Sequence, residues 1–137
     1  MGEVHVPYSK VRGHPPDFRV WYRFFTLEEG GRLQPPGQGI RCDFSYAEDN
    51  AVLRPGRPYQ VAIIHPEFLD DHGEVIQERG RLVQPTGYAY MWILFDEARR
   101  RVHRKRITVG TKGYFQEGTK RIAEVEVVEI IGLATRP

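Results

Sequence analysis

The sequence predicts an all-β protein: a closed, six-stranded antiparallel barrel with Greek-key-like connections and one extra inserted β-hairpin. Two observations carry this prediction. Short segments rich in aromatic and β-branched residues recur along the chain, with turn residues between them. No segment of useful length repeats its apolar residues with the helical period. Because closure removes exposed strand edges, we expect a barrel rather than an open sheet.

Composition limits the class of protein. The chain has 137 residues, of which 40% are hydrophobic, enough for one domain with a single core. A mean hydropathy of −0.51, without a long apolar run, predicts no membrane span and no membrane partner. No apolar signal segment is visible, and a single cysteine (Cys42) fits a reducing compartment, so we expect a cytoplasmic location. The net charge of +2 favours nucleic acid only if the cations are segregated.

The barrel domain is expected over residues 18–137, after an extended, non-helical lead-in over residues 1–17 that is interrupted by proline and glycine. The strand over 18–27 alternates, so that Phe18, Val20, Tyr22 and Phe24 share one face. The other expected segments are 40–46, 59–64 (stopped by His65 and Pro66), 88–95, the return strand 101–109, and 122–131 with a bulge near Val128 and Glu129. A turn is expected over 70–73.

The stretch between the first two strands, residues 28–39, organises the chain. It contains paired glycines, paired prolines and, among them, Arg32. Glycine permits backbone angles that other residues avoid, and proline restricts them. We therefore expect a rigid loop that presents Arg32 at a defined place.

Three islands in this order resemble the third, C-terminal β-barrel domain of elongation factor Tu. The first runs from 18 to 44 and includes Glu-Glu-Gly-Gly-Arg before Gly-Ile-Arg. The second is Arg-Pro-Gly at 54–56 followed by 59–66, which ends Ile-His-Pro. The third is Phe-Gln-Glu-Gly-Thr-Lys at 115–120, followed by a valine-rich strand that ends at Gly132.

The resemblance implies a six-stranded antiparallel barrel that helps to bind aminoacyl-tRNA and contacts protein neighbours. The family positions that approach tRNA correspond to Arg32, His65 and Gly118. The GTPase domain of that family is absent from this chain, which has no phosphate-binding loop motif, so we expect no nucleotide and no cofactor. Residues 74–106 have no good counterpart, and we interpret them as the inserted strand pair, where a new function would sit.

A basic run lies at the end of this insertion: Arg99, Arg100, Arg101, Arg104, Lys105 and Arg106. On a hairpin it would bind phosphates, with bases stacked on Tyr88, Tyr90 and Trp92, or it would be a solvated tip that prevents aggregation. Arg32 has two readings as well, a phosphate clamp or a structural arginine that bonds loop carbonyls or pairs with Glu28 or Glu29. His65 is read chiefly as a strand-end residue and Gly118 as a turn residue.

The sequence gives little support for a catalytic or metal site. Glu67, Asp70, Asp71 and His72 could be proposed as a metal site, but a turn rich in aspartate is ordinary. Cys42 falls on the apolar face of its strand, where thiols are usually inert. We therefore expect no metal and no enzyme.

The expected function is a non-catalytic binding module for RNA or tRNA, or for a translation-related partner. The nucleic-acid contacts would come from Arg32, His65, Gly118 and the basic side chains Arg99, Arg101, Arg104, Lys105 and Arg106. The alternative is a protein-interaction module without nucleic-acid binding, using exposed aromatics such as Trp21 or Trp92. A small enzyme is the remaining class.

Overall fold

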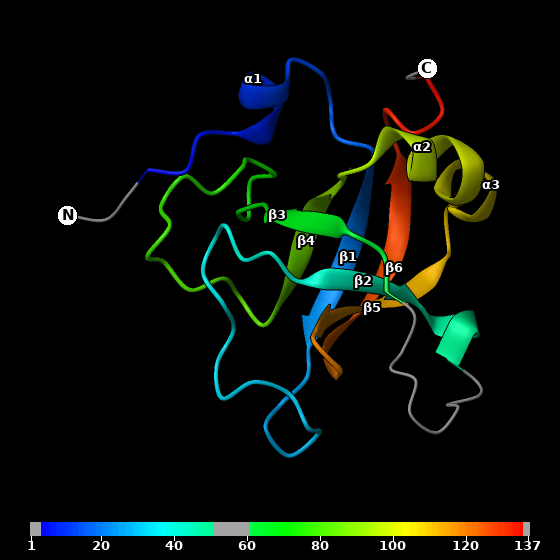
Figure 1. Ribbon diagram of the computed structural model, residues 1–137. Helices are drawn as coiled ribbons and strands as arrows, with labels where there is room; N and C mark the ends of the chain where they lie inside the picture. The colour runs from blue at the N-terminus through cyan, green and yellow to red at the C-terminus, as the bar shows by residue number, and fades with distance from the viewer. Residues whose placement is uncertain (1–3, 51–60, 136–137) are drawn as a thin grey trace.

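The computed structural model describes residues 4–50 and 61–135 and shows an all-β protein, as predicted (Figure 1). Six antiparallel strands form one sheet in the order β2-β5-β6-β1-β4-β3. The strands are β1 (Phe18–Phe24), β2 (Asp43–Tyr46), β3 (Ile64–Phe68), β4 (Thr86–Ile93), β5 (Lys112–Glu117) and β6 (Lys120–Ile130). The short helices are α1 (Tyr8–Arg12), η1 (Ala47–Asn50), α2 (Asp96–Ala98), η2 (Arg99–His103) and α3 (Arg104–Arg106).

The sheet curls into a half-barrel, and the predicted closure is wrong. The edge strands β2 and β3 do not form a ladder with each other. Phe44 and Ala62 bridge this gap, and each donates a backbone hydrogen bond to the other, at 3.0 and 2.7 Å. Further along β3, the buried side chain of Gln38 accepts from Phe68 N–H and donates to the Phe68 carbonyl, both at 2.9 Å. A side chain and a single bridge thus satisfy edge groups that a closed barrel would have paired.

Period-2 alternation places the core. Phe18, Val20, Tyr22 and Phe24 are all buried, whereas the residues between them are half-buried, as the sequence predicts. Tyr22 packs edge-on against Phe68 from the opposite side of the curl, with ring centroids 5.3 Å apart. Rings from distant strands therefore fill the concave face, where each contributes a large apolar area.

The predicted bulge in the last strand is confirmed. Arg19 pairs with Glu129, but Val20 pairs with Val127, so Val128 is the extra residue. An extra residue bends a strand and increases its twist. It also shifts the alternation by one residue, so that Glu129 pairs with Arg19 and Ile130 pairs with the buried Phe18.

The third strand begins later than predicted and runs through Pro66. Residues 51–60, which include the second island's Arg-Pro-Gly and the start of the expected strand, lie outside the described residues. His65 and Pro66 do not stop the strand, because β3 is an edge. Proline is tolerated where its missing N–H would face away from the ladder.

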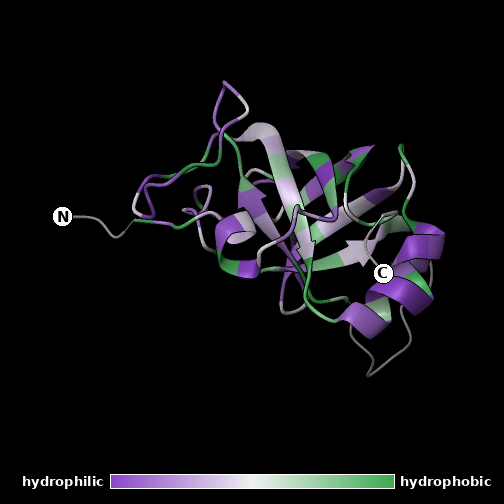
Figure 2. Ribbon diagram, turned by 90° about the horizontal axis from the view of Figure 1, so that it is seen from above, coloured by the Kyte–Doolittle hydropathy of each residue, from purple (hydrophilic) through white to green (hydrophobic). Residues whose placement is uncertain are grey.

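The prediction of a return strand over 101–109, the second strand of the inserted hairpin, is wrong. Residues 96–106 form one continuous helical segment of α2, η2 and α3, called the 96–106 helix below. Its buried residues Arg99 and His103 are four positions apart and therefore share one helix face. Because the buried face of this helix consists of arginine and histidine, the sequence shows no hydrophobic periodicity there. Figure 2 accordingly colours this helix mostly hydrophilic.

The lead-in is not simply extended. Residues 8–12 form α1, which begins after Pro7 and ends at Gly13 with the left-handed φ of 74°. Glycine adopts this angle without strain, which explains the helix end. Val4 bridges Glu78, and His5 N–H donates to the Gln77 carbonyl at 2.7 Å. The N-terminal segment, residues 4–14, therefore packs on the outer face of β3 and β4 (Figure 1).

Candidate functional site

Hydrogen bonds close the glycine-rich loop, and its arginine already has a carboxylate partner. Glu29 accepts hydrogen bonds from Thr26 N–H and from both terminal nitrogens of Arg23, at 2.9 to 3.0 Å. Arg32 donates to Glu117 Oε1 at 2.7 Å and to the Gln34 carbonyl at 3.2 Å. Arg32 thus bonds a loop carbonyl, as one reading expected, but its carboxylate partner lies on β5 rather than at Glu28 or Glu29.

Arg32 and Gly118 lie at the same end of the half-barrel. Gly118 has a φ of 59° in the tight turn between β5 and β6, directly after Glu117. The turn reading is confirmed. Beside it, a pocket of about 220 Å³ is lined mostly by apolar groups, including Phe25, Leu27 and Leu33.

Three of the six residues of the basic run, Arg99, Arg104 and Arg106, make contacts that hold the fold. Arg99 is 1% exposed and lies against Asp17 and Asp96, so it is not available to phosphate. Arg104 donates to the Leu133 carbonyl at 3.0 Å. Arg106 forms ion pairs with Glu48 and Asp49 at 2.7 and 2.8 Å. Arg101 and Lys105 are exposed, and Arg101 lies 3.3 Å from Glu97.

These predicted site residues do not form one surface. Asp17, which contacts Arg99, precedes the first residue of β1, and the Arg32 loop follows its last residue. A seven-residue strand separates them by roughly 20 Å. His65 lies apart from both on β3, where its Nδ1 is 3.2 Å from the Cys42 carbonyl across the β2–β3 gap.

The aromatic residues that were expected to stack bases or to dock a partner do not share one exposed surface either. Trp92 is fully buried under the N-terminal segment, so it is neither a stacking platform nor an exposed docking residue. Tyr88 is 44% exposed, and Arg19 lies 5.2 Å above its ring. Trp21 is half-buried and lines a depression of about 210 Å³ on the outer face of β1, β5 and β6.

A different group of cations meets around Tyr8. Arg12 comes from α1, Arg41 from the loop before β2, and Arg79 from the loop before β4. We call Arg12, Arg41 and Arg79 the arginine cluster. Burial raises the pKa of the Tyr8 hydroxyl and the Glu67 carboxylate raises it further, whereas the guanidinium groups of Arg41, Arg79 and Arg12 lower it. All three positive charges therefore act on one hydroxyl.

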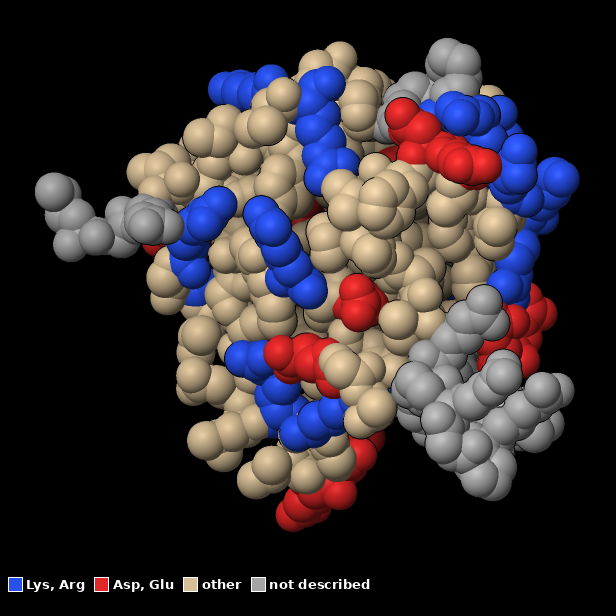
Figure 3. All heavy atoms as spheres, viewed as in Figure 1, with Lys and Arg blue, Asp and Glu red and all other residues tan. Residues whose placement is uncertain are grey.

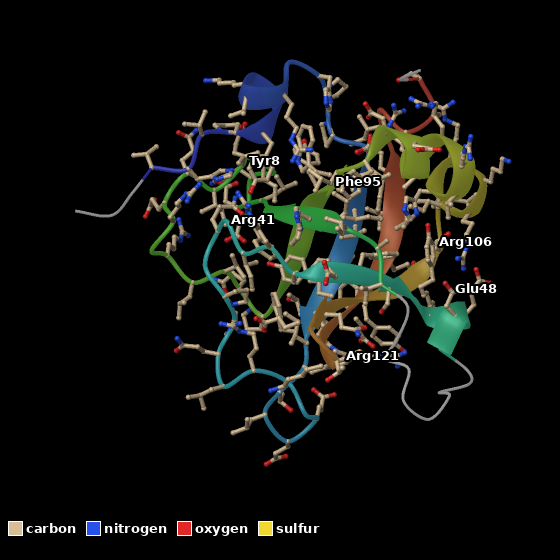
Figure 4. All side chains as sticks on the ribbon, in the orientation of Figure 1. Tyr8, Arg41, Glu48, Phe95, Arg106 and Arg121 are labelled. Carbon is tan, nitrogen blue, oxygen red and sulfur yellow. The ribbon has the colours of Figure 1, made fainter. Side chains whose placement is uncertain are left out.

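Contacts hold the members of the cluster. The Arg12 guanidinium lies 5.5 Å from the Tyr8 ring centroid and 5.3 Å from that of Trp92. The Arg79 guanidinium lies against Gly39, where a Cβ would be 3.7 Å from its central carbon. Arg41 and Arg79 are exposed and Arg12 is half-buried. Figure 4 shows Tyr8 and Arg41 near each other, and Figure 3 shows basic side chains gathered on this side of the molecule.

The sequence did not indicate this cluster. Its members are separated by about 30 and 40 positions, and no spacing rule connects them. Arg12 lies in the expected lead-in, Arg41 in an expected strand and Arg79 in the expected insertion, and the segments that carry them meet only because the N-terminal segment folds over the sheet. The three arginines were therefore overlooked, whereas the consecutive basic run was conspicuous.

Among residues 4–50 and 61–135, the side chains considered for a metal site do not form one. Within these ranges, no group of three or more His, Cys, Asp and Glu side chains could hold a metal ion. Asp70 Oδ1 accepts from the backbone N–H groups of His72 and Glu74, as expected of a turn, while Glu67 is buried elsewhere. Cys42 is buried, and burial raises the pKa of its thiol.

No protein-family model matches the chain, and no curated protein matches it. The resemblance to the elongation factor Tu barrel therefore stays a prediction. Within the described part of the chain, no helix is long and apolar enough to cross a membrane.

Proposed function

We propose that the protein is a non-catalytic module that binds RNA, with tRNA as the first candidate, through phosphate contacts at the arginine cluster. The observation that carries the proposal is that arginines from three separate segments exert their charge on the Tyr8 hydroxyl, with the Arg12 guanidinium 5.5 Å from the Tyr8 ring centroid. Guanidinium is planar, always charged and presents several donors, which suits phosphate oxygens. The proposal keeps the expected ligand class and moves its main site away from Arg32 and the basic run.

Prior engagement of the other cations supports this relocation. Arg32 and Arg106 already donate to carboxylates, and binding a phosphate there would require these pairs to break. In the arginine cluster, Arg12 is held over two aromatic rings instead. A stacked guanidinium keeps its edge donors for a ligand and loses less side-chain entropy on binding.

The test is salt-dependent binding of a labelled tRNA pool, measured by fluorescence anisotropy. Three phosphate contacts on a single strand or a duplex predict a log–log slope of roughly −2 to −3 against salt. The variant Arg12→Gln/Arg41→Gln/Arg79→Gln should lose at least ten-fold in affinity, and the slope should approach zero. Its melting temperature is measured in parallel, because Arg12 also packs on Trp92.

A matched control removes the same charge elsewhere. Arg100→Gln/Arg101→Gln/Lys105→Gln changes three exposed cations of the 96–106 helix. We expect its affinity to stay within about two-fold of the parent. Equal losses in the two variants, or no binding by the parent at low salt, would refute the proposal.

The pocket beside the Arg32 loop favours a second candidate, a protein partner. Leu27 and Leu33 at its rim are 60% and 83% exposed. Exposed apolar side chains beside a pocket are typical of docking sites. A photo-crosslinker at position 33 should then give a discrete adduct that Leu27→Asp removes, and a crosslinker at Val109, which is 65% exposed, should not.

A further inference from the structure

A buried carboxylate lies beneath the arginine cluster. Glu67 is 1% exposed and comes from the edge strand β3. Its Oε1 accepts from Trp92 Nε1–H at 3.0 Å, and its Oε2 accepts from Tyr8 N–H at 2.8 Å and lies 2.7 Å from His5 Nε2. Both oxygens are therefore satisfied, which a buried carboxylate requires.

These contacts join three parts of the chain. Glu67 and Trp92 belong to neighbouring strands, and His5 and Tyr8 belong to the N-terminal segment that covers them. Without the N-terminal segment, Glu67 and Trp92 would face solvent on the outer side of the sheet. The carboxylate thus fixes the N-terminal segment to the sheet at two points, one on each side of Pro7.

The same attachment determines where the arginines lie. Tyr8 is the first residue of α1, and Arg12 follows one helical turn later above the Tyr8 and Trp92 rings. On the other side, His5 N–H donates to the Gln77 carbonyl, two residues before Arg79. Releasing the N-terminal segment would therefore separate Arg12 from Arg41 and Arg79.

We propose that Glu67 is a positioning residue, which assembles the arginine cluster by anchoring the N-terminal segment; this inference rests on the proposed function. Glu67 does not contact the ligand. Its negative charge lies below the Tyr8 hydroxyl, and its three donors preorganise the cationic surface above. Preorganisation raises affinity because less order must be imposed on binding.

The test compares Glu67→Gln with the parent in binding of the labelled tRNA pool. Glutamine retains one acceptor oxygen, but its amide group would face N–H donors, so at least one contact of the network is lost. We expect at least a ten-fold loss of affinity at temperatures where circular dichroism shows a folded sheet. His5→Ala breaks the network from the N-terminal segment alone and should act in the same direction.

Tyr46→Phe is the matched control. It deletes the buried bond to His103 at the 96–106 helix and should leave tRNA affinity unchanged. A merely structural role for Glu67 predicts the opposite, namely equal binding by Glu67→Gln and Tyr46→Phe variants at temperatures where both are folded.

A readout without RNA separates this inference from the proposed function. In a Trp21→Phe background, Trp92 is the sole tryptophan, and Glu67→Gln or His5→Ala should increase its quenching by acrylamide at least two-fold. If the parent binds no RNA, the proposed function fails, whereas the quenching still tests the anchoring. Parental quenching and parental affinity in both variants would overturn the role of Glu67.

Discussion

The hydroxyl of Tyr46 lies 2.7 Å from Nδ1 of His103, and the two rings stack with their centroids 5.9 Å apart. This contact joins β2 to the 96–106 helix. The Arg106 guanidinium covers the other side of the Tyr46 ring at 3.7 Å. The helix that carries the basic run is therefore held to the sheet by its own basic residues.

His103 predicts a pH-dependent stability. Burial and, to a smaller extent, the nearby Arg106 charge lower its pKa from the ordinary 6.5 to about 4. Because the unfolded chain binds the proton more readily, stability is full above pH 6.5 and falls as the pH drops toward 4. We expect a loss of about 2 kcal/mol over this window, measured by urea denaturation. His103→Gln should flatten the profile between these pH values, and an unchanged profile would contradict the assignment.

The burial of Arg99 predicts that its substitution lowers the stability of the fold rather than the affinity for RNA. Its Nε lies 3.9 Å from Asp17 Oδ1, and both side chains are almost fully buried. Arg99→Met removes the positive charge that lies beside the buried Asp17 carboxylate. This loss should lower the free energy of unfolding by about 3 kcal/mol. Arg101→Met, at a side chain 78% exposed, should change it by less than about 0.5 kcal/mol. Equal effects would show that the Arg99 pair contributes nothing.

The close packing at Gly31 predicts that this position of the glycine-rich loop does not tolerate a side chain. A Cβ there would lie 2.2 Å from the Phe25 carbonyl oxygen, so the backbone would have to move. Gly31→Ala should lower the free energy of unfolding by about 2 kcal/mol or more, as forced overpacking does. Gly80→Ala, where nothing lies within 4 Å, is the control and should be nearly neutral. Thermal melting of both variants provides the measurement.

Cys42 predicts an unreactive thiol. It is 2% exposed, and burial raises its pKa, so the reactive thiolate is scarce at neutral pH. We expect Ellman's reagent to label it only as the protein unfolds, with a rate that rises in step with denaturant. Rapid labelling of the folded protein would mean that Cys42 is accessible.

Strands whose pattern alternates cleanly were predictable. β1 and β6 follow the expected faces, and the bulge at Val128 appears where the alternation of valine and glutamate breaks. The turn at Gly118 was predictable for the same local reason, because a positive φ favours glycine.

Elements whose burial depends on polar residues were not predictable. The 96–106 helix buries Arg99 and His103, and the outer face of β3 buries Glu67. Each is stabilised by a partner distant in the chain: Asp17, Tyr46 and His5, respectively. A local pattern assigns such residues to solvent, since it does not contain the partner.

Local residue choice was thus enough to establish the β class, the position of most strands and the turn at Gly118. Folding alone decided that the curl stays open, that Arg99, Arg104 and Arg106 of the basic run contact the rest of the fold, and that the segments carrying Arg12, Arg41 and Arg79 come together. The physical reason is the distance along the chain over which each interaction acts. Strand alternation and turn formation depend on residues adjacent in sequence. A charged surface depends on which distant segments the buried groups hold together.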